Sequence, residues 1–321
     1  MHIPDGLMDP SVALVGWVEF AVAISLVLLV SGRKIREQDL PRVAILAAGI
    51  FVAQMVNFPI GGGTTGHLIG GALFAIIAGP YMAILGMTVV ILIQALMFGD
   101  GGITALGLNA LNMAVIAPLA GWGVFGLLEP LYASGGRLGR WAAAAAASWA
   151  SVFIAAAACA GELAVSFAIS GGDFGIAPTI AIPAMLAYHA VIAFGEAIIT
   201  VGILAYLSDV APKLLSRKSA AEKEGVPSFR GSRIGFSAAA ILAVFALILP
   251  LYFLYAAEGE DGLEQTMSDA GTGEGSAMFV APFSYGESYF AALFAGMLGF
   301  VIAGLATVAI LKTLESKNGE G

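Results

Sequence analysis

The sequence has 321 residues, of which 59% are hydrophobic and only 11% are charged, and its mean hydropathy is +0.93. Soluble domains carry about a quarter charged residues, so this composition excludes an ordinary soluble protein and predicts an integral membrane protein. The formal net charge is −8, but the positions of the basic residues are more informative than the total, because they report which loops face the cytoplasm.

Apolar stretches of about 20 residues, long enough to cross a bilayer, recur along the whole chain. A shorter apolar segment, 67–78, ends at Gly79-Pro80, where proline breaks a helix, and we count it as an additional short span. The predicted fold class is all-α: a polytopic transmembrane helical bundle of about seven spans, followed by a two-span unit. The longer spans are expected near residues 11–30, 43–59, 81–98, 108–128, 142–168, 182–207, 234–256 and 288–311.

The basic residues predict the orientation of the chain. With nine spans and an outside N-terminus, all 14 lysines and arginines fall on the cytoplasmic side, as the positive-inside rule requires, whereas eight spans would place some of them outside. We therefore expect a multi-pass protein of a bacterial or archaeal plasma membrane, in contact with the lipid bilayer. The four basic groups are Arg33, Lys34, Arg36 and Arg42; Arg137 and Arg140; Lys213, Arg217, Lys218, Lys223, Arg230 and Arg233; and Lys312 and Lys317.

Composition also divides the chain into parts. Residues 1–207 form a first membrane domain, and the polar, basic, proline-containing residues 208–233 are typical of a cytoplasmic linker. Residues 234–321 form a two-span unit whose external segment, 258–287, contains acidic residues and no basic one. This segment is either a solvated loop or a module that attracts cations or contacts a partner. Its acidic residues are Glu258, Glu260, Asp261, Glu264, Asp269, Glu274 and Glu287.

The chain begins with "MHIPDG", which is either an unstructured start or a chelating group. A free α-amine on Met1, the ionised backbone amide of His2 and Nδ1 of its imidazole would close a five-membered and a six-membered chelate ring. Three nitrogens in one plane suit Ni(II) or Cu(II), and an ionised amide favours the same metals. Pro4 favours an extended conformation at Ile3 and stiffens the exit from this site.

A fourth nitrogen is available from His67, one of three histidines, in "FPIGGGTTGHLIGG". The predicted topology places this stretch on the same side as the N-terminus, and its glycines allow close approach of another backbone. We therefore expect the N-terminus to pack against His67, giving a plane of four nitrogens. Taken alone, a histidine at a membrane interface is more often a hydrogen-bonding residue than a metal ligand.

Two further stretches place polar groups within or beside apolar spans. In "YHAVIAFGEAIIT", Glu196 follows His189 by two helical turns, so both side chains lie on one face of the helix. They are either metal ligands or members of a buried hydrogen-bond network. In "FGDGGITALGLNALNMA", Asp100 and Asn109 lie at the predicted outer end of a span. Irregular backbone at membrane depth must be satisfied by protein or water, so this element either lines a polar cavity or packs as a tight re-entrant turn.

These four motifs, in this order over roughly residues 1–207, resemble the CbiM/NikM substrate-binding components of energy-coupling-factor (ECF) transporters for cobalt and nickel. The two-span unit resembles the small CbiN/NikN accessory component, whose hallmark is a Pro-Asp-Gly-Leu-Glu stretch. Here residues 260–264 read "EDGLE", with glutamate where that family has proline, and residues 281–285 add to the likeness. The chain therefore resembles a fused, NikMN-like protein.

The resemblance implies a substrate-capture subunit that binds its metal through Met1, His2 and His67. It implies supporting roles around the site for Asp5, Asp100, Asn109, His189 and Glu196. The transported substrate would be Ni²⁺ or Co²⁺, with Ni²⁺ favoured by planar nitrogen ligation and with no organic cofactor.

The expected partners are a transmembrane coupling (T) component and two ABC ATPases, and no nucleic acid. The sequence contains no Gly-Lys-Ser/Thr phosphate loop, so we expect a transporter subunit and not an enzyme. One alternative is a secondary transporter or channel for a small solute, which inverted repeats and intramembrane basic residues would favour. Another is an intramembrane metallohydrolase, which would need a His-Glu-x-x-His helix. None of these signatures is found in the sequence.

Overall fold

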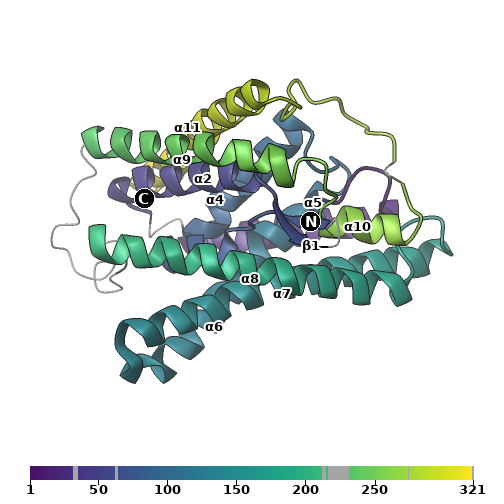
Figure 1. Ribbon diagram of the computed structural model, residues 1–321, viewed down its shortest axis with the longest axis horizontal. Helices are drawn as coiled ribbons and strands as arrows, with labels where there is room; N and C mark the ends of the chain where they lie inside the picture. Colours follow the sequence, from purple (N-terminus) through teal and green to yellow (C-terminus); the bar gives the residue numbers. More distant parts are fainter. Residues whose placement is uncertain (32–34, 62–63, 212–214, 216–230, 274, 320–321) are drawn as a thin grey trace.

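The computed structural model describes residues 1–31, 35–61, 64–211, 215, 231–273 and 275–319, which form a helical bundle (Figure 1). A small antiparallel hairpin of β1 (Phe58–Gly61) and β2 (Thr64–Gly66) interrupts it. Single turns of 3₁₀-helix (Glu37–Asp39, Ala133–Gly135) and π-helix (Gln94–Phe98, Leu111–Ile116) complete the described elements. The α-helices are α1 (Pro10–Ser31), α2 (Leu40–Gln54), α3 (Gly71–Ala78), α4 (Pro80–Ile93), α5 (Leu106–Ala110), α6 (Ala117–Leu131), α7 (Gly136–Ser170), α8 (Pro178–Val210), α9 (Gly231–Tyr255), α10 (Gly262–Asp269) and α11 (Tyr289–Gly319).

Seven helical stretches among the described residues are long and apolar enough to cross a membrane, which confirms the predicted all-α, multi-pass fold class. The expected spans 43–59 and 67–78 correspond to shorter helices, α2 with 15 residues and α3 with 8. Helix α2 ends at Gln54, before the predicted boundary, and the chain enters β1 at Phe58, where Pro59 keeps the residue before it extended. The seven stretches are Pro10–Ser31, Pro80–Phe98, Leu106–Leu131, Gly136–Ser170, Pro178–Val210, Gly235–Tyr255 and Tyr289–Ser316.

The long helices pack through small residues. Helices α7 and α8 run side by side along one face of the molecule, while α2, α9 and α11 lie together on the opposite face (Figure 1). A Cβ atom on Gly299 of α11 would lie 1.9 Å from the ring of Phe51 in α2, so only glycine lets these two helices approach. Helix α11 is thereby packed directly on α2.

Large apolar side chains cover the outside of the bundle. Leu29 of α1 is 77% exposed, Ile198 of α8 73% and Leu247 of α9 75%. In a soluble protein a contiguous apolar surface of this kind is a liability, whereas in a bilayer it faces the lipid tails. The exposed faces of these helices therefore agree with a membrane location.

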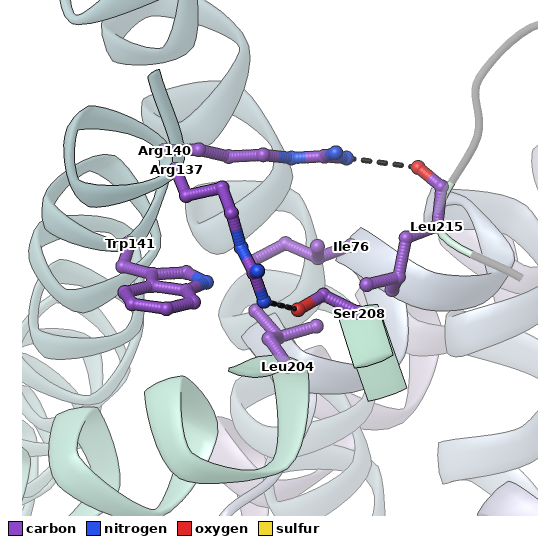
Figure 2. A pocket seen from close by; sticks show the side chains of 7 residues that line it. All are labelled: Ile76, Arg137, Arg140, Trp141, Leu204, Ser208 and Leu215. Atoms are coloured by element: carbon purple, nitrogen blue, oxygen red, sulfur yellow. Dashed lines mark hydrogen bonds between the residues drawn. The ribbon is translucent and has the colours of Figure 1, made fainter. Parts of the chain in front are cut away.

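The two ends of the bundle differ in charge. The N-terminus, α10 and the segment leading to α11 lie at one end, and the C-terminus lies toward the other (Figure 1). At that second end, Arg137 donates to Ser208 and Arg140 donates to the carbonyl of Leu215, beside a cavity of about 60 Å³ shown in Figure 2. The predicted orientation requires the N-terminus and these two arginines to lie at opposite ends of the bundle, as they do here. Most of the predicted linker 208–233 lies outside the described residues.

Candidate metal centre

The first residues of the chain are buried, and not an unstructured start. Met1 is 2% exposed and Ile3 is fully buried. Asn109 holds the backbone of Ile3 on both sides: its Oδ1 accepts from Ile3 N at 2.8 Å, and its Nδ2 donates to Ile3 O at 3.1 Å. The backbone N–H of Gly102 donates to the same carbonyl at 2.8 Å. The residue directly after His2 is therefore fixed by the turn and helix that follow α4.

Asp5 fastens the next part of the N-terminal segment. One of its carboxylate oxygens accepts from the backbone N–H and the hydroxyl of Thr104, at 2.8 and 2.7 Å, and the other accepts from Met278 N at 3.0 Å. Burial raises the pKa of Asp5, but these hydrogen bonds outweigh it and hold the pKa below its usual value. A Cβ atom on Gly102 would lie 2.2 Å from Asp5 N. For the stretch "FGDGGITALGLNALNMA", the structure therefore favours a tightly packed turn over the lining of a polar cavity.

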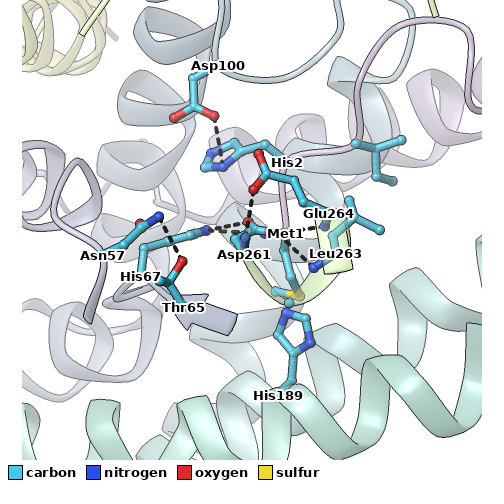
Figure 3. A network of polar contacts seen from close by, with 12 residues as sticks. Met1, His2, Asn57, Thr65, His67, Asp100, His189, Asp261, Leu263 and Glu264 are labelled. Carbon is cyan, nitrogen blue, oxygen red and sulfur yellow. Dashed lines mark hydrogen bonds and ion pairs between the residues drawn. The ribbon is translucent and has the colours of Figure 1, made fainter. Parts of the chain in front are cut away.

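The N-terminal segment brings nitrogen atoms together at the hairpin (Figure 3). The α-nitrogen of Met1 lies 3.1 Å from Nε2 of His67. The rings of His2 and His67 stack with their centroids 5.2 Å apart and an interplanar angle of 29°. Nδ1 of His67 lies 3.0 Å from the carbonyl of Leu68, which can only accept a hydrogen bond. The hydrogen of a neutral His67 is therefore on Nδ1, and Nε2 presents its lone pair to the amine.

His2 has an oxygen acceptor at each ring nitrogen. Nδ1 lies 3.1 Å from a carboxylate oxygen of Asp100, and Nε2 lies 3.2 Å from Oε1 of Gln94. Burial lowers the pKa of His2 to about 4, against the opposing attraction of Asp100, so the ring is neutral at pH 7. Tyr285, from the C-terminal unit, donates its hydroxyl to Asp100 at 2.9 Å.

Asp261 of the C-terminal unit reaches the same place. Its Oδ2 lies 2.9 Å from the α-nitrogen of Met1 and 3.6 Å from Nε2 of His67. Its Oδ1 accepts from the backbone N–H groups of Leu263 and Glu264 and caps α10. Burial raises the pKa of Asp261, but the ammonium of Met1 and the His67 ring hold it well below its usual range. Burial lowers the pKa of the Met1 amine, but the attraction of Asp261 more than offsets this. The pKa of the amine is therefore raised above its usual value.

Backbone hydrogen bonds hold α10 over the hairpin. Thr65 of β2 donates from its backbone N–H to Glu260 O at 2.8 Å and from its hydroxyl to Gly259 O at 3.0 Å. A Cβ atom on Gly262 would lie 2.8 Å from Cε1 of His189, so glycine is needed where α10 meets α8. The C-terminal unit therefore covers the nitrogen cluster.

His189 and Glu196 bind different partners. Nδ1 of His189 lies 2.9 Å from the carbonyl of Met185, and its ring faces the cluster from below in Figure 3. The Glu196 carboxylate accepts from the backbone N–H groups of Ile69 and Gly70, at 2.6 and 2.9 Å. Glu196 thus satisfies amides just before α3, and it holds the segment between β2 and α3 that contains His67.

The space inside the cluster is small. A cavity of about 10 Å³ has room for roughly one water-sized particle, which suits an ion and no organic solute. Among the described residues, no group of three or more His, Cys, Asp or Glu side chains is arranged to hold a metal. The cavity is lined by Met1, Gly66, His67, Ile69, His189, Ile192, Asp261 and Gly262.

Four residues at the site were not predicted from the sequence: Asp261, Gln94, Gln54 and Tyr285. Asp261 and Tyr285 lie in the two stretches that resemble the accessory component, and that likeness was the available signal. Gln54 and Gln94 are amides inside apolar spans, a costly placement that marks a specific partner.

Comparison with known proteins identifies the family. The family CbiM, described as "Cobalt uptake substrate-specific transmembrane region", matches residues 2–214. A relative in Haloquadratum walsbyi is 41% identical over 215 residues, which are 67% of this chain and 93% of that protein. The "Fused nickel transport protein NikMN" of Rhodobacter capsulatus is 37% identical over 282 residues, 84% of this chain and 78% of that protein.

A solved structure supports the same assignment. The "Crystal Structure of an Truncated Transition metal Transporter" superposes with a TM-score of 0.59 and 35% identity, and covers 65% of this chain and 99% of that one. The match to the fused relative covers 84% of this chain, which is more than the family match over residues 2–214. The likeness to the fused relative therefore continues into the C-terminal part of the chain. The chain belongs to the CbiM family of cobalt uptake substrate-specific transmembrane regions.

Proposed function

We propose that this chain is the substrate-capture subunit of an ATP-driven ECF importer for a divalent transition metal, with Ni²⁺ favoured over Co²⁺. The relatives are named as transporters of nickel and of cobalt, and the buried nitrogen cluster gives such an ion a place to bind. Residues 1–207 would be the metal-binding membrane domain, residues 208–233 a cytoplasmic linker, and residues 234–321 the accessory unit.

The observation that carries the proposal is the 3.1 Å separation between the Met1 α-nitrogen and Nε2 of His67, with the His2 ring stacked beside them. In the proposed complex, the α-amine of Met1, the amide and Nδ1 of His2, and Nε2 of His67 bind the metal. Because ligands must be deprotonated, the ion displaces the proton that the amine shares with Asp261. Nδ1 of His2 likewise exchanges its contact with Asp100 for the metal.

The ligand chemistry favours nickel. Four nitrogens that include an ionised amide impose a planar field, which Ni(II) accepts and which octahedral ions disfavour. Cobalt would bind the same nitrogens in a less demanding geometry. Capture would take place from the outer side, and a T component and two ABC ATPases would supply the energy.

Isothermal titration with Ni²⁺, together with absorption spectra, tests the metal site on full-length protein with a native N-terminus. His2→Ala removes the imidazole that closes the six-membered ring, so we expect loss of tight binding and of the planar d–d band. A matched control, Ser134→Ala, changes an exposed side chain at the other end of the bundle and should bind like the native chain. Equal binding by the native chain and His2→Ala would refute the terminal chelate.

Uptake in vesicles tests the transport assignment against a secondary transporter or channel. We expect import of Ni²⁺ only when the T component and both ATPases are present with ATP. Import by this chain alone, driven by an ion gradient, would contradict the ECF assignment while leaving the metal site intact.

A further inference from the structure

Two buried glutamines connect His2 to the protein backbone. Nε2 of Gln54 donates to the carbonyl of Ile69 at 2.7 Å, and Nε2 of Gln94 donates to Oε1 of Gln54 at 2.7 Å. Oε1 of Gln94 then lies 3.2 Å from Nε2 of His2. Gln54 is 3% exposed and Gln94 is fully buried, so water has little access to compete for these hydrogen bonds.

The carbonyl of Ile69 fixes the direction of every hydrogen bond in this series from Ile69 to His2. A backbone carbonyl only accepts, so Gln54 must turn its NH₂ group toward Ile69 and its Oε1 toward Gln94. Gln94 must then turn its NH₂ group toward Gln54, which leaves only its Oε1 for His2. An oxygen at that position favours a hydrogen on Nε2 of His2.

We propose that Gln94, oriented through Gln54, is a positioning residue that keeps the hydrogen of His2 on Nε2 and so reserves Nδ1 for the transported metal. This inference rests on the proposed function, because only Nδ1 can close the six-membered ring with the His2 amide. Metal-bound histidines commonly donate their second N–H to a protein oxygen, which fixes the ring and its tautomer. In this chain the oxygen would come from an amide inside the bundle.

The position of Asp100 explains why the hydrogen bond from His2 to Gln94 is needed. Its carboxylate lies 3.1 Å from Nδ1 of His2 and is held by the hydroxyl of Tyr285. A neutral imidazole has a single N–H, and a carboxylate is the stronger acceptor of the two oxygens. Without Gln94 the hydrogen would move to Nδ1, onto the nitrogen that the metal needs. The fixed amide therefore opposes Asp100 at the other side of the ring.

The other two histidines provide an internal reference. His67 and His189 each direct Nδ1 at a backbone carbonyl, of Leu68 and of Met185, so both are Nδ1–H tautomers when neutral. Of the three histidines of the sequence, we expect only His2 to carry its hydrogen on Nε2. Three ring signals can be resolved and assigned one by one.

The experiment is ¹⁵N NMR of full-length protein labelled only at histidine, in lipid nanodiscs without metal, at a pH where the rings are neutral. The native chain should show one Nε2–H ring, assigned to His2 by its loss in His2→Gln, and two Nδ1–H rings. Gln94→Leu removes the acceptor, and Gln54→Leu removes the group that orients it. In both variants we expect the His2 signal to change to the Nδ1–H pattern and Ni²⁺ affinity to fall by about 10–100-fold, the usual range for such supporting groups.

Ser148→Ala is the matched control, because it also removes a buried hydrogen bond, to Thr200, and leaves the His2 network intact. It should alter neither the His2 signal nor the affinity. A native His2 that is already Nδ1–H, or a His2 signal and affinity unchanged in Gln94→Leu, would overturn the inference. The proposed function fails separately, by absence of Ni²⁺ binding to the native chain, whatever the tautomer.

Discussion

Asp261 lies 2.9 Å from the α-nitrogen of Met1, although 260 residues separate them in the sequence. Both groups are buried, with side-chain exposures of 13% and 1%. Burial of two charges is favourable only when they are paired and hydrogen-bonded, so this contact joins the C-terminal unit to the N-terminus. The C-terminal part of the chain is therefore built into the candidate site.

Asp261→Asn should destabilise the protein. The change removes the negative partner of a buried ammonium, and breaking such a pair costs on the order of 3 kcal/mol. Thermal unfolding in detergent, followed by hydrogen exchange of residues 259–269, would show a lower midpoint and faster exchange over α10. Asp269→Asn, on the exposed side of the same helix, is the control and should change the midpoint little. Equal effects of the two variants would contradict the buried ion pair.

The same ion pair predicts a pH dependence. The pKa of Asp261 lies below its ordinary 3.8 and that of the amine above its ordinary 8.0. The stability due to Asp261 is present above pH 3.8 and is lost as the pH falls through its depressed pKa. The stability due to the amine is present below pH 8.0 and is lost as the pH rises through its raised pKa.

The difference in unfolding midpoint between the native chain and Asp261→Asn measures this dependence. We expect this difference to be largest at mildly acidic pH, where the amine is charged in both proteins, and to shrink as the pH rises and the buried amine loses its proton. A difference that grows above pH 8 would show that Asp261 acts through some group other than the ammonium.

The sequence predicted the helical bundle and the approach of the N-terminus to His67, because apolar length and histidine chemistry are local signals. The family resemblance implied supporting roles for Asn109 and Asp5, and in the structure Asn109 hydrogen-bonds Ile3 and Asp5 hydrogen-bonds Thr104. Asp261 could not be selected from seven acidic residues of one external segment, since its role depends on how α10 docks on β2. Gln54 was equally hidden, because only the folded bundle brings it next to Gln94.

Asn109→Leu should release the N-terminal segment. Asn109 both accepts from and donates to the backbone of Ile3. Gly102 still donates to the Ile3 carbonyl in the variant, but the buried Ile3 N–H is left unpaired, which costs about 1–3 kcal/mol. We expect faster hydrogen exchange in residues 2–6 and at least a tenfold weaker Ni²⁺ affinity by titration. Asn112→Leu is the control on the same stretch of helix, because Asn112 binds Glu162 and not the N-terminus. It should lower stability without changing exchange in residues 2–6.

Gly299→Ala tests the packing of the C-terminal unit on the first domain. The added Cβ would lie 1.9 Å from the Phe51 ring, which is fully buried and packs against Phe98 and Tyr285. The ring has little room to move, so we expect a loss of about 1–3 kcal/mol from overpacking.

Gly304→Ala is the matched control on α11, because its Cβ would meet Ala48 at an ordinary 3.7 Å. Unfolding midpoints of the two variants decide the prediction, and Gly304→Ala should be neutral or stabilising, since alanine favours the helix. Because displaced Phe51 would push on Tyr285, which holds Asp100 beside His2, Gly299→Ala should also weaken Ni²⁺ binding. Loss of stability with unchanged binding would show that the helix packing and the site are independent.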